Sequence, residues 1–480
     1  MLNRADNTIQ IKEVGNPSQA IPGKSTRLRW LENFFAEHRD KLAWVHFAMF
    51  IVFAVVLFVP LYLPESAETA KPWNDFTVFS NFLMWGVWFP LVFLSVILTG
   101  RSWCGLLCPM GAASEHANRI GLKLSVPAFI RWEGMPIVCF LIITFLGQTV
   151  GVRDHKEAMA YIFGGLMLLA VVIGLIYGKK GRVWCRHMCP IGLLLGLYSR
   201  LGIINFHPKR PKSGGDQYRE KSVCPTMIDV LRKQESRHCI ECFKCVNPGS
   251  KKTVMVSTRM AGEEVENIQK HNPNSAEVWF FFVGTGAALG GFLWLILPHY
   301  QQFRQTLGEW AIERGWYWIG ESGPGWLMSV HPQRREVFNW LDFYSIVIFM
   351  GVVTVVFTAV MALITWYQAR LIQKNVKFPI SESIFNVVAY QYMPVAMIAL
   401  LVGLGGKIFV LLSVFGLPEL LVTTLKATLF LLGTLWSIRI TTRLVASYEL
   451  NGINYYLPTL VGAGGSILVA MTWWPAVFGW

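Results

Sequence analysis

Long apolar runs separated by short polar stretches are the main pattern along this chain. About nine of these runs approach the length of about 20 residues that a helix needs to cross a bilayer. They cover residues 43–63, 77–98, 133–151, 158–178, 277–298, 341–366, 392–414, 419–440 and 454–477. The pattern predicts an all-α polytopic membrane protein with about nine transmembrane helices, the first four of which form two repeated helical hairpins. Lys407 and Lys426 interrupt two of the last three runs.

Basic residues predict how these helices are oriented. Clusters of Lys and Arg precede the first run and follow the second, fourth, sixth and eighth runs. By the positive-inside rule the N-terminus is therefore cytoplasmic and the C-terminus external. This orientation places eight of the nine cysteines at the cytoplasmic side, and Cys139 alone inside a span. A reducing compartment disfavours structural disulfides, so the cysteines are interpreted as metal ligands.

The composition supports a membrane protein and narrows its function. Of the 480 residues, 53% are hydrophobic and 15% are charged, whereas soluble proteins carry about a quarter charged residues. This excludes a disordered chain, a coiled coil and a disulfide scaffold, and it disfavours a cytosolic enzyme. The formal net charge is +14. We attribute this excess to the topology of the loops, and we expect no nucleic-acid partner.

A repeated motif contributes two cysteine pairs. Residues 100–122 match residues 181–203 without a gap, and both copies contain Gly-Arg-x-Trp-Cys-x3-Cys-Pro-x-Gly. The cysteines are Cys104 and Cys108 in the first copy, and Cys185 and Cys189 in the second. A repeat at a fixed offset indicates two equivalent halves, so the two pairs could converge on one site of four thiols. Thiolates suit iron–sulfur clusters, zinc or Cu(I), and the sequence leaves these alternatives open.

The proline after each pair predicts where the next helix begins. Proline is favoured at the first position of a helix, which predicts helices over residues 109–122 and 190–203. Both are interpreted as amphipathic helices lying along the cytoplasmic interface.

The longest polar stretch, residues 205–275, contains a different cysteine motif. Cys239, Cys242 and Cys245 form a C-x2-C-x2-C run. Bacterial ferredoxins continue such a run with x3-C-P, and that last cysteine binds the other cluster of a pair. Zinc is the weaker alternative, because its sites usually have two C-x2-C pairs or histidine partners.

The run lacks its own terminal Cys-Pro, and a separate Cys-Pro stands upstream. Gly249 and Ser250 occupy the two expected places, whereas Cys224-Pro225 has no cysteine run before it. Both absences fit a two-cluster ferredoxin unit that has kept one cluster. The sequence therefore predicts one [4Fe–4S] cluster, whose ligands are Cys224, Cys239, Cys242 and Cys245.

Together these motifs resemble a known group of proteins. Two membrane Cys-x3-Cys-Pro motifs followed by a cytoplasmic ferredoxin segment are similar to the polyferredoxin-type membrane iron–sulfur proteins. That group includes the ferredoxin-type quinol-oxidising subunit of periplasmic nitrate reduction, the nitrous-oxide reductase regulator and the oxidase-assembly iron–sulfur protein. The resemblance covers about residues 40–250. It implies electron transfer in the bacterial inner membrane, linked to the quinone pool or to metal reduction.

The resulting hypothesis divides the chain into four segments. A cytoplasmic segment (1–42) precedes a four-helix membrane repeat (43–204), a ferredoxin-like [4Fe–4S] segment (205–275) and a C-terminal membrane domain of about five helices (276–480). The predicted function is electron transfer between a cytoplasmic donor or the quinone pool and a membrane or periplasmic redox partner. The alternative is copper binding, copper reduction or cofactor assembly. No residue set indicates a substrate-transforming site, so the protein would be an oxidoreductase subunit at most. A second thiolate-bound metal or cluster at the repeat and a quinone are the further candidate ligands.

Overall fold

The computed structural model describes residues 26–67, 69–179, 181–215, 217–334, 336–376 and 383–479. Residues 1–25 of the predicted N-terminal segment 1–42 lie outside the described residues. Among the described residues, eight helical stretches are long and apolar enough to cross a membrane. They are Arg39–Tyr62, Phe76–Thr99, Lys156–Ile176, Ser275–Ile296, Trp340–Asn375, Ile384–Gly403, Glu419–Ala446 and Ile453–Thr472. The prediction of an all-α polytopic membrane protein is confirmed.

The helices of these spans are continuous in some cases and interrupted in others. Their bounds are α2 (Leu42–Phe58), α3 (Phe76–Phe82), α4 (Phe89–Thr99), α8 (Lys156–Ile176), α11 (Ser275–Ile296), α13 (Trp340–Asn375), α14 (Ile384–Ala389), α15 (Met393–Leu404), α17 (Glu419–Ala446) and α18 (Ile453–Thr472). A π-helical segment, Leu83–Trp88, joins α3 to α4. Pro90 lies in the first turn of α4, where its missing N–H breaks the regular α-helical hydrogen bonding.

Shorter elements complete the fold. They are α1 (Arg29–Glu37), α5 (Pro109–Ile120), α6 (Ala128–Arg131), α7 (Met135–Thr149), α9 (Pro190–Tyr198), α10 (Glu263–Glu266), α12 (Pro298–Glu313), α16 (Gly406–Val414), α19 (Trp474–Phe478), β1 (Ile204–Pro208), β2 (Val254–Thr258), β3 (Val330–His331) and β4 (Glu336–Val337). The apolar helix α7, with 15 residues, occupies the predicted run 133–151 and packs against α9 and α11.

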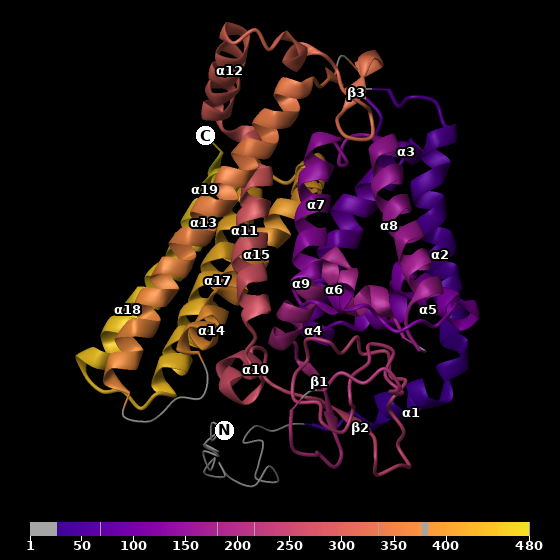
Figure 1. Cartoon of the computed structure of the whole chain (residues 1–480), viewed down its shortest axis with the longest axis vertical. Coiled ribbons are helices and arrows are strands. Elements are labelled where there is room, and N and C mark those ends of the chain that lie inside the picture. The colour runs from indigo at the N-terminus through magenta and orange to yellow at the C-terminus, as the bar shows by residue number, and fades with distance from the viewer. Residues whose placement is uncertain are drawn as a thin grey trace, which may run out of the picture.

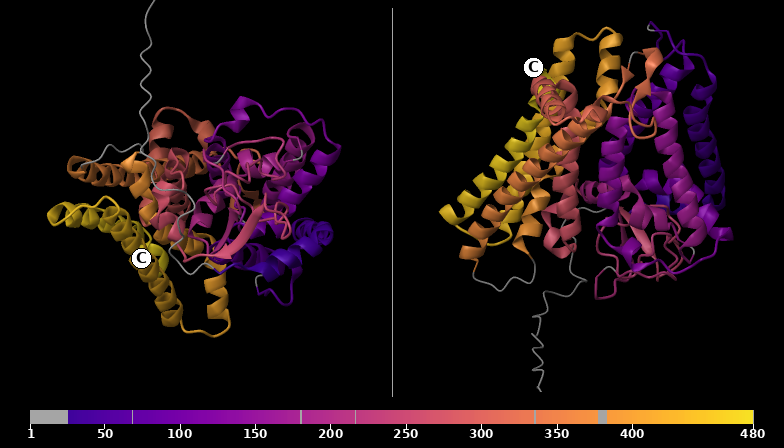
Figure 2. Two further views of the ribbon diagram at one scale, coloured as in Figure 1. Left: turned by 90° about the horizontal axis from the view of Figure 1, so that it is seen from below. Right: turned by 45° about the horizontal axis from the view of Figure 1, so that its top comes forward.

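The long helices form two groups that meet along α11. The helices α2, α4, α7 and α8 form one group, and α13, α15, α17 and α18 form the other (Figures 1 and 2). The outward faces are apolar: on α13, for example, Val355 and Leu363 are 67% and 64% exposed. Exposed apolar surface of this extent is expected where a helix faces lipid. The segment with β1 and β2 lies at the lower end in Figure 1, and α12 and β3 lie at the upper end.

Two predictions about helices need correction. The seventh run was expected at 392–414, but its helix begins at Ile384 and ends at Leu404, before α16. Lys407 then binds the side chain of Asn81 and donates to the Arg153 carbonyl at 2.7 Å. The break before α16 thus accompanies a position of Lys407 at which polar atoms satisfy its amine, which lipid would not do.

The helix after the second Cys-Pro is also different from the prediction. An amphipathic interfacial helix was expected at 190–203, but α9 is buried at eight of its nine residues. Its neighbours α7, α4 and α11 surround it. A helix that is apolar on all sides belongs in a core, so α9 is part of the packed interior that supports the second cysteine pair.

A small antiparallel sheet organises the polar segment. Strands β1 and β2 pair with Phe206 opposite Val256. Phe206 packs in a small apolar core that also contains Cys224, Cys239 and Phe243. The Val256 N–H donates to the buried Glu32 carboxylate of α1 at 2.8 Å. This sheet therefore ties the polar segment to the beginning of the first transmembrane stretch.

A buried ion cluster joins the polar segment to α11, the helix along which the two helix groups meet. The fully buried Arg200 guanidinium contacts Glu264 at 2.9 Å, Glu277 at 2.9 Å and Glu235 at 3.1 Å. Glu235 and Glu264 belong to the polar segment, and Glu277 is in the first turn of α11. Burial raises the pKa of Glu264, but the Arg259 and Arg200 guanidiniums outweigh this and hold it well below its usual range.

We expect Arg200→Met to destabilise the protein by about 3–5 kcal/mol, because it leaves buried carboxylates without their shared cation. The measurement is thermal unfolding in detergent. Arg304→Met is the matched control, since Arg304 pairs with Asp342 at a position where its side chain is 36% exposed. That exposed pair is worth at most about 1 kcal/mol. Equal destabilisation by both variants would contradict this account.

Candidate metal centre

The two copies of the cysteine repeat fold in the same way. Each follows the end of a membrane helix, α4 or α8, and forms one π-helical segment, Trp103–Leu107 or Trp184–Met188. The backbone N–H groups of Cys108 and Cys189 donate to the carbonyls of Trp103 and Trp184, at 2.9 and 2.8 Å. The next residue in each copy is a proline, which begins α5 or α9. Both cysteine pairs are thus held at the ends of rigid helices.

The four cysteines of the repeat, which we call the repeat thiols, are close neighbours. Burial raises the pKa of the Cys189 thiol well above its ordinary value, and three neighbouring thiols raise it further. These neighbours are Cys185, Cys108 and Cys104. Because like charges crowd together here, the thiolates are stable only beside a compensating positive charge such as a metal.

The other four cysteines, which we call the segment thiols, also gather. Burial raises the pKa of Cys245 well above its ordinary value, and the thiols of Cys224, Cys239 and Cys242 raise it further. The structure thus brings Cys224 among the thiols of the run. The Cys224 sulfur also lies 3.2 Å from the Thr226 hydroxyl.

The loop that carries the run has an unusual backbone. Glu241 and Phe243, which alternate with the cysteines, both have left-handed conformations, with φ of 52° and 57°. Non-glycine residues adopt this region at a cost, and such strain is concentrated at functional sites. The loop that carries the segment thiols therefore has a backbone conformation that Glu241 and Phe243 do not favour by themselves.

One arginine lies between the two sets of thiols. Arg182 is fully buried. Burial raises the pKa of Cys185 among the repeat thiols and of Cys242 among the segment thiols, and the Arg182 guanidinium offsets part of this rise in both. The Arg182 side chain donates to the Cys104 carbonyl at 2.6 Å and to Glu115 at 2.7 Å. Burial raises the pKa of Glu115, but Arg182 and Lys244 bring it down to about 2. The two sets therefore adjoin across one guanidinium group.

The surroundings of the thiols fit bound iron–sulfur clusters. Among the described residues, buried Arg101 Nε and Nη2 and Arg182 Nη2 have no hydrogen-bond partner. Buried donors are rarely left unpaired, and sulfide or thiolate sulfur would accept from them. A thiolate-bound iron–sulfur cluster carries net negative charge, which these cations would offset. Eight cysteine thiols in two groups of four would match in number the ligands of two [4Fe–4S] clusters.

Two matched glycines make room for these arginines. A Cβ at Gly111 would stand 3.0 Å from both Arg182 Nη1 and Cys185 Sγ. A Cβ at Gly192 would stand 3.0 Å from the Cys189 Cβ and 3.5 Å from Arg101 Nη2. Each arginine of the repeat thus reaches the helix of the other copy, and glycine permits the close approach.

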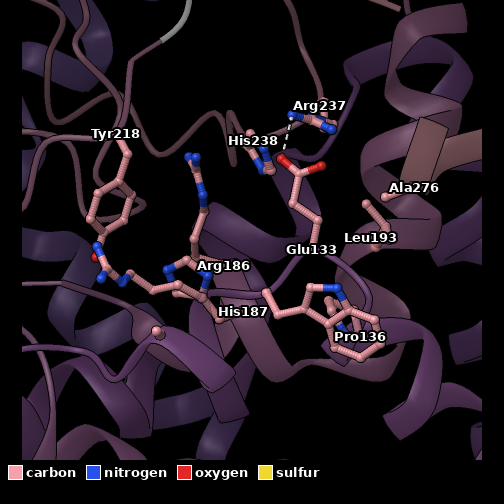
Figure 3. Close-up of a pocket in the computed structure, with 12 residues that line it drawn as sticks. Glu133, Pro136, Arg186, His187, Leu193, Tyr218, Arg237, His238 and Ala276 are labelled. Atoms are coloured by element: carbon pink, nitrogen blue, oxygen red, sulfur yellow. Dashed lines mark ion pairs between the residues drawn. The ribbon is translucent and has the colours of Figure 1, made fainter. Parts of the chain in front are cut away.

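A cavity of about 390 Å³ opens beside both sets of thiols. Figure 3 shows His187, which lies between Cys185 and Cys189 in sequence, and His238, which directly precedes Cys239. Among the described residues, neither Nε2 atom has a hydrogen-bond partner. Arg131 and Arg186 lie over the Tyr218 ring, at 5.9 and 5.6 Å from its centroid.

Part of the cavity wall is apolar, and one of its residues is an exposed tryptophan. The exposed Trp132, between α6 and α7, is one of its walls, together with Pro136 and Leu193. Tryptophan prefers the boundary between lipid and water. The cavity thus combines aromatic and apolar walls with hydrogen-bonding groups next to the thiols.

Comparison with known proteins supports this assignment of the cofactor. A family described as "4Fe-4S binding domain" matches residues 81–127 and 161–211. The two matches contain the two Cys-x3-Cys-Pro motifs. They support an iron–sulfur cluster as a cofactor of this chain. No solved structure matches the chain significantly.

Several known proteins are similar to part of the chain. An uncharacterized protein of Methanocaldococcus jannaschii is 28% identical over 31% of this chain and 61% of its own length. Protein NirI of Paracoccus denitrificans is 28% identical over 34% of this chain and 26% of its own length. The ferredoxin-type protein NapH of Escherichia coli K12 is 27% identical over 33% of this chain and 62% of its own length. The chain thus spans less than two thirds of each, and the predicted resemblance to polyferredoxin-type membrane iron–sulfur proteins is confirmed.

Sequence reasoning named all eight cysteines but missed the groups around them. It treated Arg101 and Arg182 only as identical residues in the two copies of the repeat, although both lie near the thiols. Their presence at equivalent positions was the available signal, because a buried charge repeated beside a ligand pair indicates a role at the site. His187 and His238 carried a weaker signal, their position next to the cysteines.

We expect the wild-type protein to contain about eight iron atoms per chain, and Cys224→Ala to contain about four, because one cluster loses a ligand. Iron and acid-labile sulfide are measured on purified protein. Cys139→Ala, a change inside α7 away from the eight cysteines, is the control and keeps the full amount. Unchanged iron in Cys224→Ala would rule out this cysteine as a ligand.

We also expect Arg182→Gln to lower the reduction potentials of the bound centres, because a buried cation stabilises the reduced, more negative state. EPR-monitored titration measures this, and the shift should approach the roughly 59 mV that corresponds to a tenfold change for one electron. Arg182→Lys keeps the charge and should shift the potential less. Equal potentials in all three proteins would show that Arg182 does not act on the centres.

Proposed function

We propose that this multi-pass membrane protein transfers electrons through two [4Fe–4S] clusters between the quinone pool and a protein redox partner. The observation that carries the proposal is the pair of four-thiol sites that adjoin across Arg182. Each cluster, when bound, stores one electron at a time. Two such centres match the two electrons that a quinol releases. The resemblance to the ferredoxin-type protein NapH supports the same class of function.

The ligands of the two clusters follow from the two sets of thiols. The repeat thiols would bind one cluster, which the match to the 4Fe-4S binding domain supports. The segment thiols would bind the other, with Cys224 as the crossed-over fourth ligand. The division of the chain at residues 42, 204 and 275 remains part of this proposal.

The cavity beside the thiols is the proposed quinone site. Trp132 and Pro136 offer flat and apolar surface for a ring, and Nε2–H of His187 and His238 can donate to the quinone carbonyl oxygens. Neither atom has a hydrogen-bond partner among the described residues. A site at the membrane edge lets a lipid-soluble ring enter without crossing water.

The orientation is proposed from charge. The basic loops place the N-terminus and the thiol end of the molecule on the cytoplasmic side of a bacterial inner membrane. The redox partner would then exchange electrons with the segment thiols at their polar surface, or with a membrane protein beside the repeat.

The quinone site is tested by the rate at which a short-chain quinol reduces the purified protein. We expect Trp132→Ala to slow this reduction by about tenfold, a loss of about 1.4 kcal/mol, because the ring loses its aromatic wall. Phe129→Ala is the control, because Phe129 is an exposed aromatic residue on α6, close to Trp132 in sequence, and does not line the cavity.

Reduction by dithionite and the iron content separate loss of the quinone site from loss of the clusters. Both should be the same in Trp132→Ala, Phe129→Ala and the wild type. Quinol reduction at the wild-type rate in Trp132→Ala would place the quinone elsewhere. A wild-type protein that binds iron but is not reduced by any quinol would overturn the proposed partner.

A further inference from the structure

Two histidines meet at the end of the molecule opposite the thiols. His155 directly precedes α8, at its N-cap position, and Glu157 lies in the first turn of that helix. His331 lies in β3, which Figure 1 shows above the upper ends of α7 and α8, and Glu336 lies in the paired strand β4. Segments that are about 175 residues apart in sequence thus bring four metal-binding side chains together.

The possible ligand atoms are close to one another. One atom each of His155, Glu157 and His331 lies within 4.8 Å of the other two. His155 Nε2 is 3.1 Å from a carboxylate oxygen of Glu336. Ligands at about 2.0–2.2 Å from one zinc ion are separated by about 3–3.5 Å, so reorientation of these side chains, without movement of the backbone, would bring the atoms into range.

His155 is buried and only partly satisfied. Its side chain is only 2% exposed, its Nε2 contacts Glu336 without a well-aligned hydrogen bond, and its Nδ1 has no hydrogen-bond partner among the described residues. A buried polar group without a partner is costly, so it calls for a ligand. The ring lies close against Gly151, where a Cβ would stand 2.7 Å from its Cδ2.

We propose that His155, Glu157, His331 and Glu336 bind a divalent transition-metal ion of the zinc class. Two imidazole nitrogens with carboxylate oxygens are typical ligands for such ions, whereas Mg²⁺ and Ca²⁺ prefer oxygen alone. The half-exposed carboxylates leave an entry path from water. The His155 and His331 rings are stacked, with centroids 3.7 Å apart. Metal binding turns one ring out of this stack, because a metal lies in the plane of each imidazole that binds it.

The proposal is separate from the electron-transfer function. None of the four residues is among the eight cysteines or the residues that line the cavity beside them. A zinc ion has no redox chemistry, so its role here would be to fix β3 and β4 onto the end of α8.

The test is zinc titration by calorimetry of chelator-treated, full-length protein with its clusters intact. We expect one zinc ion per chain, and an affinity that falls by about tenfold or more in His331→Gln. His155→Gln should lose binding as well, but it could also disturb the loop, so the more exposed His331 is the primary variant. His299→Gln, on α12 at the same end, is the control and binds like the wild type.

Zinc bound at vacant thiols must be distinguished from zinc at this site. Cys239→Ala should keep its zinc affinity at the histidines, although it loses iron. Zinc binding should also raise the temperature of unfolding in the wild type and not in His331→Gln. Wild-type zinc affinity in both His331→Gln and His155→Gln would overturn the proposal, and so would an absence of zinc binding by the wild type.

Discussion

The buried Arg182 guanidinium is the interaction on which this arrangement depends. It comes from the second copy of the repeat, donates to the Cys104 carbonyl of the first copy, and pairs with Glu115. Its backbone N–H donates to the Pro225 carbonyl at 2.6 Å, directly after Cys224. Glu115 in turn binds Lys244, within the C-x2-C-x2-C run. Arg182, through its side chain, its backbone N–H and its partner Glu115, therefore connects both copies of the repeat to both parts of the polar segment, and its charge would compensate thiolates in both sets.

The repeat explains why the fold can bring four thiols together without a dedicated domain. Each hairpin of membrane helices ends in the same turn, and the two turns lie close together so that each contributes two thiols and one cation. The buried cluster around Arg200 then fixes the polar segment against α11, the helix along which the two helix groups meet. Rigid helices on one side and buried ion pairs on the other hold thiols that would otherwise repel one another.

The sequence could predict the helices, the repeat and the cysteines, because each leaves a local pattern. Apolar runs have the length of a bilayer, and Cys-x3-Cys-Pro recurs at one offset. Contacts between distant segments leave no such pattern. The position of Arg182 between two thiol sets, the burial of α9 and the break at Gly405 all depend on which helices become neighbours. The same holds for His155 and His331, whose proximity follows from the packing of β3 over α8.

The most direct test of the central claim is low-temperature EPR of the fully reduced protein. Two [4Fe–4S] clusters that adjoin across one arginine side chain must interact through their spins. We predict a broadened or split spectrum. It should become a simple single-cluster signal when either the repeat thiols or the segment thiols are removed by substitution. A sum of two independent signals would show that the sites lie far apart, and a single cluster signal in the wild type would show that one thiol set does not bind a cluster.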